Sequence, residues 1–240
     1  MFIRCKTHQE VCPGISGDAG RISLPKEAVD LYRILIPDSV LNQAFLFTFL
    51  SYDEIKKVLV IQNEKTKDCA LYSYAIRRVI LSRYLGIAPH EIQFCVNSHG
   101  KPGISPTVFY SLSFNLSHSR DMMILALCRD GDVGVDIEYI DVTISVMQIA
   151  RRFFGKTEIA YLSDLPEPVR TEYFYSFWTA KEAFGKAVGI GLSLALRDLS
   201  LFSLPFQEYE EMTIEGRQWQ RFSPLAGEKY RASLVVSLQR

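Results

Sequence analysis

The chain has 240 residues, 48% hydrophobic and 22% charged, a composition typical of a globular protein with one large domain or two small ones. Lys and Arg number 27, as do Asp and Glu, so the formal net charge is zero. No overall basic field therefore favours nucleic acid or a membrane surface, and any anion-binding site must be local.

The five cysteines are scattered, no two have CxxC spacing, and only four histidines are present. We therefore expect neither a zinc site nor a disulfide framework, and we expect the protein to be located in a reducing compartment. The first residues, MFIRCKTHQEV, lack the apolar run of a signal peptide, and no stretch is apolar for the ~18 residues of a membrane helix. We expect a cytoplasmic protein.

The N-terminal part begins with weak patterning. Short strands or loops are predicted over residues 1–30, followed by an apolar stretch over 31–50. Ser51, which comes shortly before two acidic residues, is typical of a helix start. A clearer helix is predicted over 68–85, where apolar side chains cluster and Gly86 supplies a stop.

Strands dominate the middle of the chain. They are predicted at 92–96, 110–119, 122–128 and 134–138, with turns at 97–102 and 130–132. Gly100 and Pro102 break either regular structure, so we expect Lys101 to be presented on a loop.

The C-terminal part is predicted to contain helices and then short β segments. The helices span 143–154, a short segment from 157, and 170–189; the β segments span 199–204, 210–214, 218–222 and 230–238. Each half of the chain thus has one long helix followed by β segments. Helices and antiparallel-looking strands alternate irregularly, so we predict an α+β fold rather than a doubly wound parallel sheet.

The helix over 170–189 carries charged residues in apolar surroundings. Trp178, Glu182 and Lys186 are spaced four residues apart and project from one side. A solvated Glu–Lys pair is the alternative, but a helix this apolar must bury most of its circumference. We therefore expect Lys181, Glu182 and Lys186 to line a crevice.

A second charged segment is the predicted strand with the sequence GVDIE. Residues two apart on a strand share a face, so Asp136 and Glu138 would stand side by side while the residues between them face the core. Like charges held together need a cation between them, or a proton on one of them. With Glu182 added, the donor set is all oxygen and suits Mg²⁺ and a phosphate-bearing substrate.

Four motifs in order carry a family resemblance. They are Gly100-Lys101-Pro102, Phe114-Asn115-Leu116-Ser117-His118-Ser119, Gly134-Val135-Asp136-Ile137-Glu138, and Trp178-Thr179-Ala180-Lys181-Glu182-Ala183 with Lys186 and Gly189-Ile190-Gly191-Leu192. Each motif is weak alone, but four in this order and spacing are specific. Over about residues 50–240 the chain resembles the 4′-phosphopantetheinyl transferases of the larger, surfactin-synthetase-activating type.

The resemblance implies an activity and a fold. Members of this family move the phosphopantetheine arm of coenzyme A onto a serine of an apo acyl or peptidyl carrier protein, require Mg²⁺, and release adenosine 3′,5′-bisphosphate. Their carriers serve fatty acid, polyketide or nonribosomal peptide synthesis. The resemblance further implies two similar α+β halves, residues 1–132 and 133–240, with coenzyme A in the cleft between them. A chain that contains both halves is expected to act as a monomer.

The resemblance also implies roles for single residues. The predicted metal ligands are Asp136, Glu138 and Glu182. The predicted catalytic residues are Asp136, Glu182 and Lys186, with Glu182 or a metal-bound water accepting the proton of the carrier serine. The predicted contacts to coenzyme A are Lys101, Ser117, His118, Lys181, Lys186 and Lys67, the last where family members often carry an arginine.

The same residues allow interpretations other than a transferase. A serine hydrolase is disfavoured, because Ser117 and His118 lack a GxSxG elbow and face apart on a strand. Two alternatives stay open. One is a non-catalytic coenzyme A or carrier-protein binding module of the same fold, and the other is an unrelated Mg²⁺ phosphodiesterase that uses the same carboxylates.

Overall fold

The computed structural model describes residues 2–7, 21–40, 42–105, 111–190, 197, 203–204, 206–224 and 226–237. Its regular elements are, in chain order, β1 (Phe2–Thr7), β2 (Ala28–Leu35), α2 (Gln43–Phe47), α3 (Tyr52–Leu59), α4 (Glu64–Leu85), the 3-10 turn η1 (Pro89–Glu91), β3 (Phe94–Val96), β4 (Pro102–Ile104), β5 (Leu112–Ser119), β6 (Met122–Arg129), β7 (Val133–Tyr139), α5 (Val146–Phe153), α6 (Lys156–Asp164), α7 (Val169–Val188), β8 (Tyr209–Ile214), β9 (Arg217–Phe222) and β10 (Tyr230–Ser237). The predicted β segment at 199–204 lies mostly outside the described residues.

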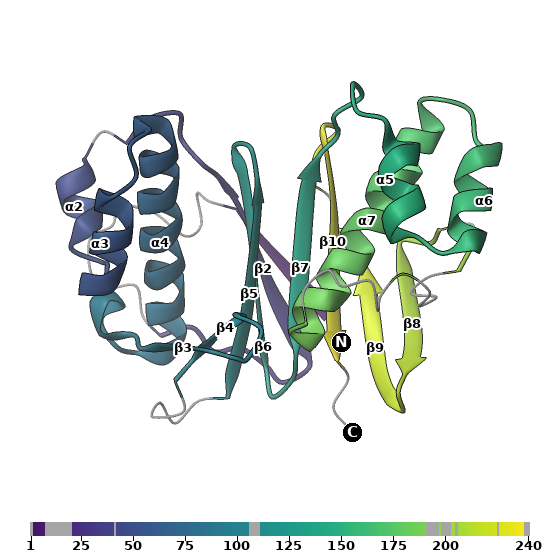
Figure 1. Cartoon of the computed structure of the whole chain (residues 1–240). Coiled ribbons are helices and arrows are strands. Elements are labelled where there is room, and N and C mark those ends of the chain that lie inside the picture. Colours follow the sequence, from purple (N-terminus) through teal and green to yellow (C-terminus); the bar gives the residue numbers. More distant parts are fainter. Residues whose placement is uncertain are drawn as a thin grey trace.

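Two four-stranded sheets organise the chain (Figure 1). The first has the order β1-β2-β6-β5 and the second has the order β7-β10-β9-β8, with β3 and β4 forming a separate short ribbon. Strand β1 pairs with β2 in parallel, and the other described pairings are antiparallel. Largely antiparallel sheets flanked by helices confirm the predicted α+β class.

The two sheets and their helices are stacked in layers (Figure 1). Helix α4 covers one face of the first sheet, where Ile80 packs in the same core cluster as Phe114. The other face of the first sheet packs against the second sheet, as Ala126 and Val135 do. Helix α7 covers the remaining face of the second sheet with Phe184 and its neighbours. Strands β5 and β7, each at the edge of its sheet, therefore lie side by side.

Capping groups set the helix boundaries. Ser51 accepts the N–H of Glu54 at 3.4 Å and Glu54 accepts the N–H of Ser51 at 3.1 Å, a capping box that confirms the predicted start of α3. Helix α4 begins at Glu64, one turn earlier than predicted, because the Asn63 side chain caps its first turn. Gly189, with φ of 85°, ends α7 in the left-handed conformation that glycine tolerates.

The apolar stretch over 31–50 is not a single element. It contains most of β2, which pairs with β1 along one edge and with β6 along the other. It also contains the short helix α2, which packs on α4. Apolar runs of this length do not by themselves distinguish a buried strand from a buried helix, so their division follows from tertiary packing. In the described parts of the chain, no helix combines the length and apolar character needed to cross a bilayer.

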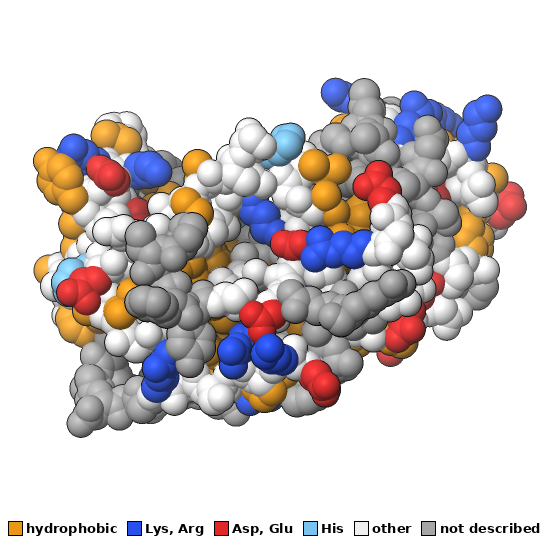
Figure 2. Space-filling view, turned by 90° about the horizontal axis from the view of Figure 1, so that it is seen from below, with side chains coloured by type: hydrophobic (Ala, Val, Ile, Leu, Met, Phe, Trp, Pro, Cys, Tyr) orange, Lys and Arg blue, Asp and Glu red, His pale blue; other side chains and the backbone are white. Residues whose placement is uncertain are grey.

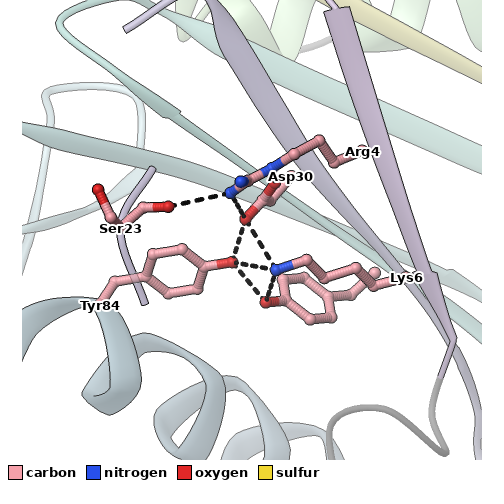
Figure 3. A network of polar contacts seen from close by, with 6 residues as sticks. Arg4, Lys6, Ser23, Asp30 and Tyr84 are labelled. Atoms are coloured by element: carbon pink, nitrogen blue, oxygen red, sulfur yellow. Dashed lines mark hydrogen bonds and ion pairs between the residues drawn. The ribbon is translucent and has the colours of Figure 1, made fainter. Parts of the chain in front are cut away.

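A buried polar network joins β1 to β2 and α4 (Figure 3). Asp30 is fully buried and accepts hydrogen bonds from Arg4 Nη2 at 2.6 Å and from Lys6 at 3.1 Å. The Tyr84 hydroxyl donates to the same carboxylate and also bonds to the Tyr32 hydroxyl. Burial alone would raise the pKa of Asp30, but the hydrogen bonds from Arg4, Tyr84 and Lys6 outweigh burial and lower this pKa. The network therefore keeps Asp30 charged.

Candidate active site

Strand β7 supplies the centre of the site. Gly134, Asp136 and Glu138 lie on the side of α7, while the valine and isoleucine between them are fully buried in the core between the sheets, as predicted. A Cβ at position 134 would lie 2.0 Å from the Ala183 carbonyl oxygen of α7, so only glycine permits this approach. The close approach lets side chains of α7 reach the carboxylates of β7.

Asp136 is contacted by a side chain of β5, in the first sheet, and by a side chain of α7, the helix that covers the second sheet. It is 3% exposed, and its Oδ1 accepts a hydrogen bond from the Ser117 hydroxyl of β5 at 2.8 Å. The Lys186 ammonium of α7 lies 2.7 Å from the same oxygen and 2.9 Å from Ser117 Oγ. Three residues predicted for the site, each from a different element, thus form one closed triangle of polar contacts.

Strand β5 contacts β7 through side chains rather than through a backbone ladder. Asn115 Oδ1 accepts the backbone N–H of Val135 at 2.9 Å. The Ser119 hydroxyl accepts the backbone N–H of Tyr139 at 3.0 Å and donates to Glu138 Oε2 at 2.9 Å. Three alternate side chains of β5, those of Asn115, Ser117 and Ser119, therefore bind the strand that carries the carboxylates.

The three carboxyl groups of the site share a poorly solvated space. Burial raises the pKa of Asp136, and the Lys186 ammonium offsets burial only in part. Burial and then the charge of Asp136 raise the pKa of Glu138, although the hydrogen bond from Ser119 lowers it. Burial and then Asp136 raise the pKa of Glu182 to about 7, against the charge of Lys186. Such a group of like charges favours an added cation.

The donors at this position fit a hard divalent cation. Asp136 Oδ2 is buried and has no hydrogen-bond partner among the described residues. Asp136, Glu138 and Glu182 offer only oxygen, the ligand that Mg²⁺ prefers. Within the ranges that the structure describes, no three Asp, Glu, His or Cys side chains already stand in an arrangement that holds a metal ion. In proteins Mg²⁺ commonly keeps several waters and takes further ligands from substrate phosphates, so a few carboxylates can suffice to bind it.

Lys101 lies on the predicted turn and reaches the end of α7. Its ammonium donates to the carbonyls of Ala187 at 2.8 Å and Val133 at 3.2 Å, and burial lowers its pKa. Asn97, in the same turn, donates to the Gly189 carbonyl at 3.1 Å. The turn thus caps the C-terminus of α7, where the helix dipole favours a cation. The predicted contact of Lys101 with a phosphate has to compete with these two carbonyls.

Lys181 stands apart from the cluster although it precedes Glu182 in the chain. Its side chain is fully buried, and its ammonium pairs with Glu158 of α6 at 3.0 Å and donates to the Arg197 carbonyl at 3.2 Å. Consecutive helix residues point about 100° apart, so Lys181 faces α6 while Glu182 faces β7. The crevice predicted for both residues is corrected accordingly: Lys181 is engaged in the interior and does not line the site.

His118 and Lys67 lie farther from the centre. His118 is exposed on β5 and faces away from Ser117, as strand alternation requires. Lys67 pairs with Glu64 at 3.6 Å at the start of α4, a helix on the far side of the first sheet from α7 (Figure 1). Their contacts with coenzyme A stay predictions.

Three residues near the carboxylates had no predicted role at the site. Asn115 and Ser119 hold β7, and the Trp178 side chain forms a hydrogen bond that lowers the pKa of Glu138. The sequence contained one signal for the first two. Asn115, Ser117 and Ser119 occupy alternate positions of a single strand, the first two of them preceded by the apolar Phe114 and Leu116, and this period of two places the three polar groups on one face. The partner of that face is not encoded in the pattern.

Charges of both signs occur together on the surface. Figure 2 shows basic and acidic side chains next to one another near the middle of the lower face, in keeping with the balanced composition. Arg217, at the start of β9, and Asp132, just before β7, lie 2.6 Å apart and form one such ion pair. Local charge at the site, rather than an overall field, must therefore select a ligand.

Known proteins are similar to this chain over much of its length. Residues 132–235 match the 4′-phosphopantetheinyl transferase superfamily. The chain is 33% identical over 175 residues to the 4′-phosphopantetheinyl transferase HetI of Nostoc sp. (strain PCC 7120 / SAG 25.82 / UTEX 2576), covering 72% of this chain and 73% of that protein. It is also 33% identical over 160 residues to the 4′-phosphopantetheinyl transferase Sfp of Bacillus subtilis (strain 168), covering 67% of this chain and 69% of that protein.

Among solved structures, a holo-(acyl-carrier-protein) synthase from Bacillus anthracis str. Ames in complex with CoA (3′,5′-ADP) aligns with 94% of its own chain and 44% of this one. The sequence identity of that alignment is 18% and the TM-score is 0.33.

Proposed function

Because the chain belongs to the 4′-phosphopantetheinyl transferases, we propose that it moves the 4′-phosphopantetheine arm of coenzyme A to a serine of an apo carrier protein in a magnesium-dependent reaction. The similarity to HetI and Sfp confirms the family predicted from the four motifs. Both relatives are named as transferases, so a non-catalytic binding module is not favoured.

One observation carries the proposal to this site. Asp136, Ser117 and Lys186 form a closed triangle, and burial together with the charge of Asp136 raises the pKa values of Glu138 and Glu182. These are residues that the family resemblance assigns to the metal and to the phosphates of coenzyme A. Transfer of a phosphoryl group needs positioning and charge neutralisation more than covalent help from the protein. A carboxylate cluster with a lysine beside it supplies both.

The residues of the site divide the work as follows. Asp136, Glu138 and Glu182 would hold Mg²⁺, which when bound would neutralise the negative charge of the pyrophosphate. Lys186 would turn from Asp136 to the pyrophosphate near the leaving group, and Ser117 would donate to a phosphate oxygen. Further contacts to coenzyme A are proposed for Lys101, His118 and Lys67.

In the proposed transfer reaction, Glu182 acts as the base that accepts the proton of the carrier serine. The hydroxyl oxygen of the carrier serine bonds to the phosphorus that bears the pantetheine arm, and the bond from this phosphorus to adenosine 3′,5′-bisphosphate breaks. The serine proton passes to Glu182. A serine hydroxyl is a weak nucleophile, so a positioned carboxylate is needed as its base.

The arrangement of the chain supports the remaining proposals. The first sheet is built from strands up to residue 129 and the second from strands starting at residue 133, so we place the two halves at 1–132 and 133–240. Both halves contribute to the triangle at Asp136, which is consistent with a monomer that needs no partner subunit. A cytoplasmic location would match the carriers that the enzyme modifies.

The test is intact-protein mass spectrometry of apo carrier proteins incubated with this chain, coenzyme A and Mg²⁺. We expect the carrier to gain one phosphopantetheine group, and EDTA to prevent the gain. A panel of fatty acid, polyketide and peptide carriers that stays unmodified, although coenzyme A binds, would contradict the proposal. Breakdown of coenzyme A without any carrier would point instead to a phosphodiesterase.

A further inference from the structure

Ser119 has hydrogen bonds that leave its hydroxyl a single orientation. The backbone N–H of Tyr139 can only donate, so at 3.0 Å it must use a lone pair of Ser119 Oγ. The one hydroxyl proton then points to Glu138 Oε2 at 2.9 Å. A serine hydroxyl normally rotates to suit its surroundings. Here the backbone of β7 fixes its direction.

The carboxylate that accepts this hydrogen bond, that of Glu138, lies near the end of β7. Glu138 is only half-buried, unlike Asp136, and a glutamate side chain has several rotatable bonds. Ser119 lies on β5, which belongs to the other sheet, and therefore holds Glu138 from outside its own strand. A charged acceptor makes such a bond stronger than a neutral one.

We propose that Ser119 is a positioning residue for the cation, holding Glu138 so that its remaining oxygen faces Asp136 and Glu182. This inference rests on the proposed function, because it takes Glu138 as a metal ligand. Residues that orient a ligand by hydrogen bonding contribute to metal affinity without touching the metal. Ser119 would be such a residue, supplied by the half of the chain that carries no carboxylate ligand.

The chain offers a matched control on the same strand. Asn115 also binds β7 across the junction, but it accepts the backbone N–H of Val135 and contacts no carboxylate in the described structure. Loss of the Asn115 side chain would loosen the union of β5 and β7 without removing a donor from Glu138. A purely structural role of Ser119 would resemble that of Asn115.

The experiment measures Mn²⁺ binding by electron paramagnetic resonance, with saturating coenzyme A and no carrier. We expect Ser119→Ala to weaken Mn²⁺ binding by roughly tenfold or more, the usual cost of losing a partner that orients a ligand. Ser119→Thr keeps the hydroxyl and is expected to bind Mn²⁺ as the unaltered chain does. Asn115→Ala is expected to unfold at a lower temperature and to keep its Mn²⁺ affinity.

Three results would overturn the inference. Ser119→Ala could bind Mn²⁺ as tightly as the unaltered chain, Asn115→Ala could lose as much affinity, or Ser119→Thr could fail to restore binding. An unaltered chain that binds no Mn²⁺ would remove the premise and overturn the inference as well. An unaltered chain that binds Mn²⁺ yet modifies no carrier would contradict the proposed function alone, since the variants would still be ranked by affinity.

Discussion

At the scale of single residues, the two oxygens of Asp136 differ. Oδ1 is held by Ser117 and Lys186, whereas Oδ2 is buried with no hydrogen-bond partner among the described residues. Asp136→Asn keeps the shape of the side chain but removes the charge that a cation needs. We expect the transfer rate to fall by about 100-fold or more, as when a metal site loses an essential group. Initial rates of carrier modification measure this change.

The control for that variant is Asp164→Asn, at the exposed end of α6. It also removes one negative charge, but far from the triangle of contacts, so its rate should equal that of the unaltered chain. Equal rates for Asp136→Asn and Asp164→Asn would contradict the role of Asp136. Thermal unfolding of both variants establishes that each one is folded.

Two lysines of α7 are expected to respond in opposite ways. Lys181 is fully buried against Glu158, so Lys181→Met leaves a buried carboxylate without this partner and should destabilise the fold by about 3–5 kcal/mol. The affinity of the folded Lys181→Met variant for coenzyme A should be unchanged. Lys186→Met removes the charge beside Asp136 and should weaken coenzyme A binding instead. Denaturant unfolding and calorimetric titration separate these effects, and weakened binding in folded Lys181→Met would restore its predicted role.

At the scale of elements, the contact between β7 and α7 depends on Gly134. A Cβ there would lie 2.0 Å from the Ala183 carbonyl and 2.3 Å from the Ala187 nitrogen, both backbone atoms that cannot turn aside. Gly134→Ala should therefore push the helix away, at a cost of about 1–3 kcal/mol or more. Transfer should fall as well, because Lys186 would separate from Asp136. Unfolding and transfer assays on one preparation measure both effects.

Gly103→Ala is the matched control for this substitution. A Cβ at that position in β4 would meet Cys95 Sγ at 3.6 Å, an ordinary contact distance. We expect this variant to keep both stability and transfer. If Gly134→Ala behaved in the same way, the close approach of the two elements would not be what positions the site.

At the scale of the whole molecule, the network at Asp30 predicts how stability depends on pH. The pKa of Asp30 is lowered in the folded chain. The charged carboxylate therefore stabilises the fold above the pKa of Asp in the unfolded chain, about 3.9, and this stabilisation is lost as the pH falls through the pKa of Asp30 in the folded chain. Tyr84→Phe removes one donor to this charged group, which should cost about 1.5–3 kcal/mol near neutral pH. The difference from the unaltered chain should shrink in acid. Unfolding free energies across the acid range test this.

Tyr52→Phe serves as the control, because Tyr52 is 70% exposed and lies outside the network. Its unfolding free energy should follow that of the unaltered chain at every pH. A constant difference between Tyr84→Phe and the unaltered chain down to strong acid would mean that the hydroxyl does not act through the charge of Asp30.

Local patterns were enough to predict much of this protein. The alternation in the GVDIE strand placed Asp136 and Glu138 on one face, and the four-residue spacing placed Glu182 and Lys186 together on α7. The caps at Ser51 and Gly189 followed from the same kind of short-range rule. Such features depend on the period of one element and on residues a few positions apart, so a single sequence contains them.

Tertiary structure alone decided which elements meet. The polar face of β5 is visible in the sequence, but its partner β7 is chosen by the packing of two sheets whose edges adjoin. Lys181 and Lys186 look alike in a helical pattern, yet one faces α6 and the other faces Asp136. The periodicity of a helix or strand determines which residues share a face, whereas long-range packing of the core determines what that face contacts.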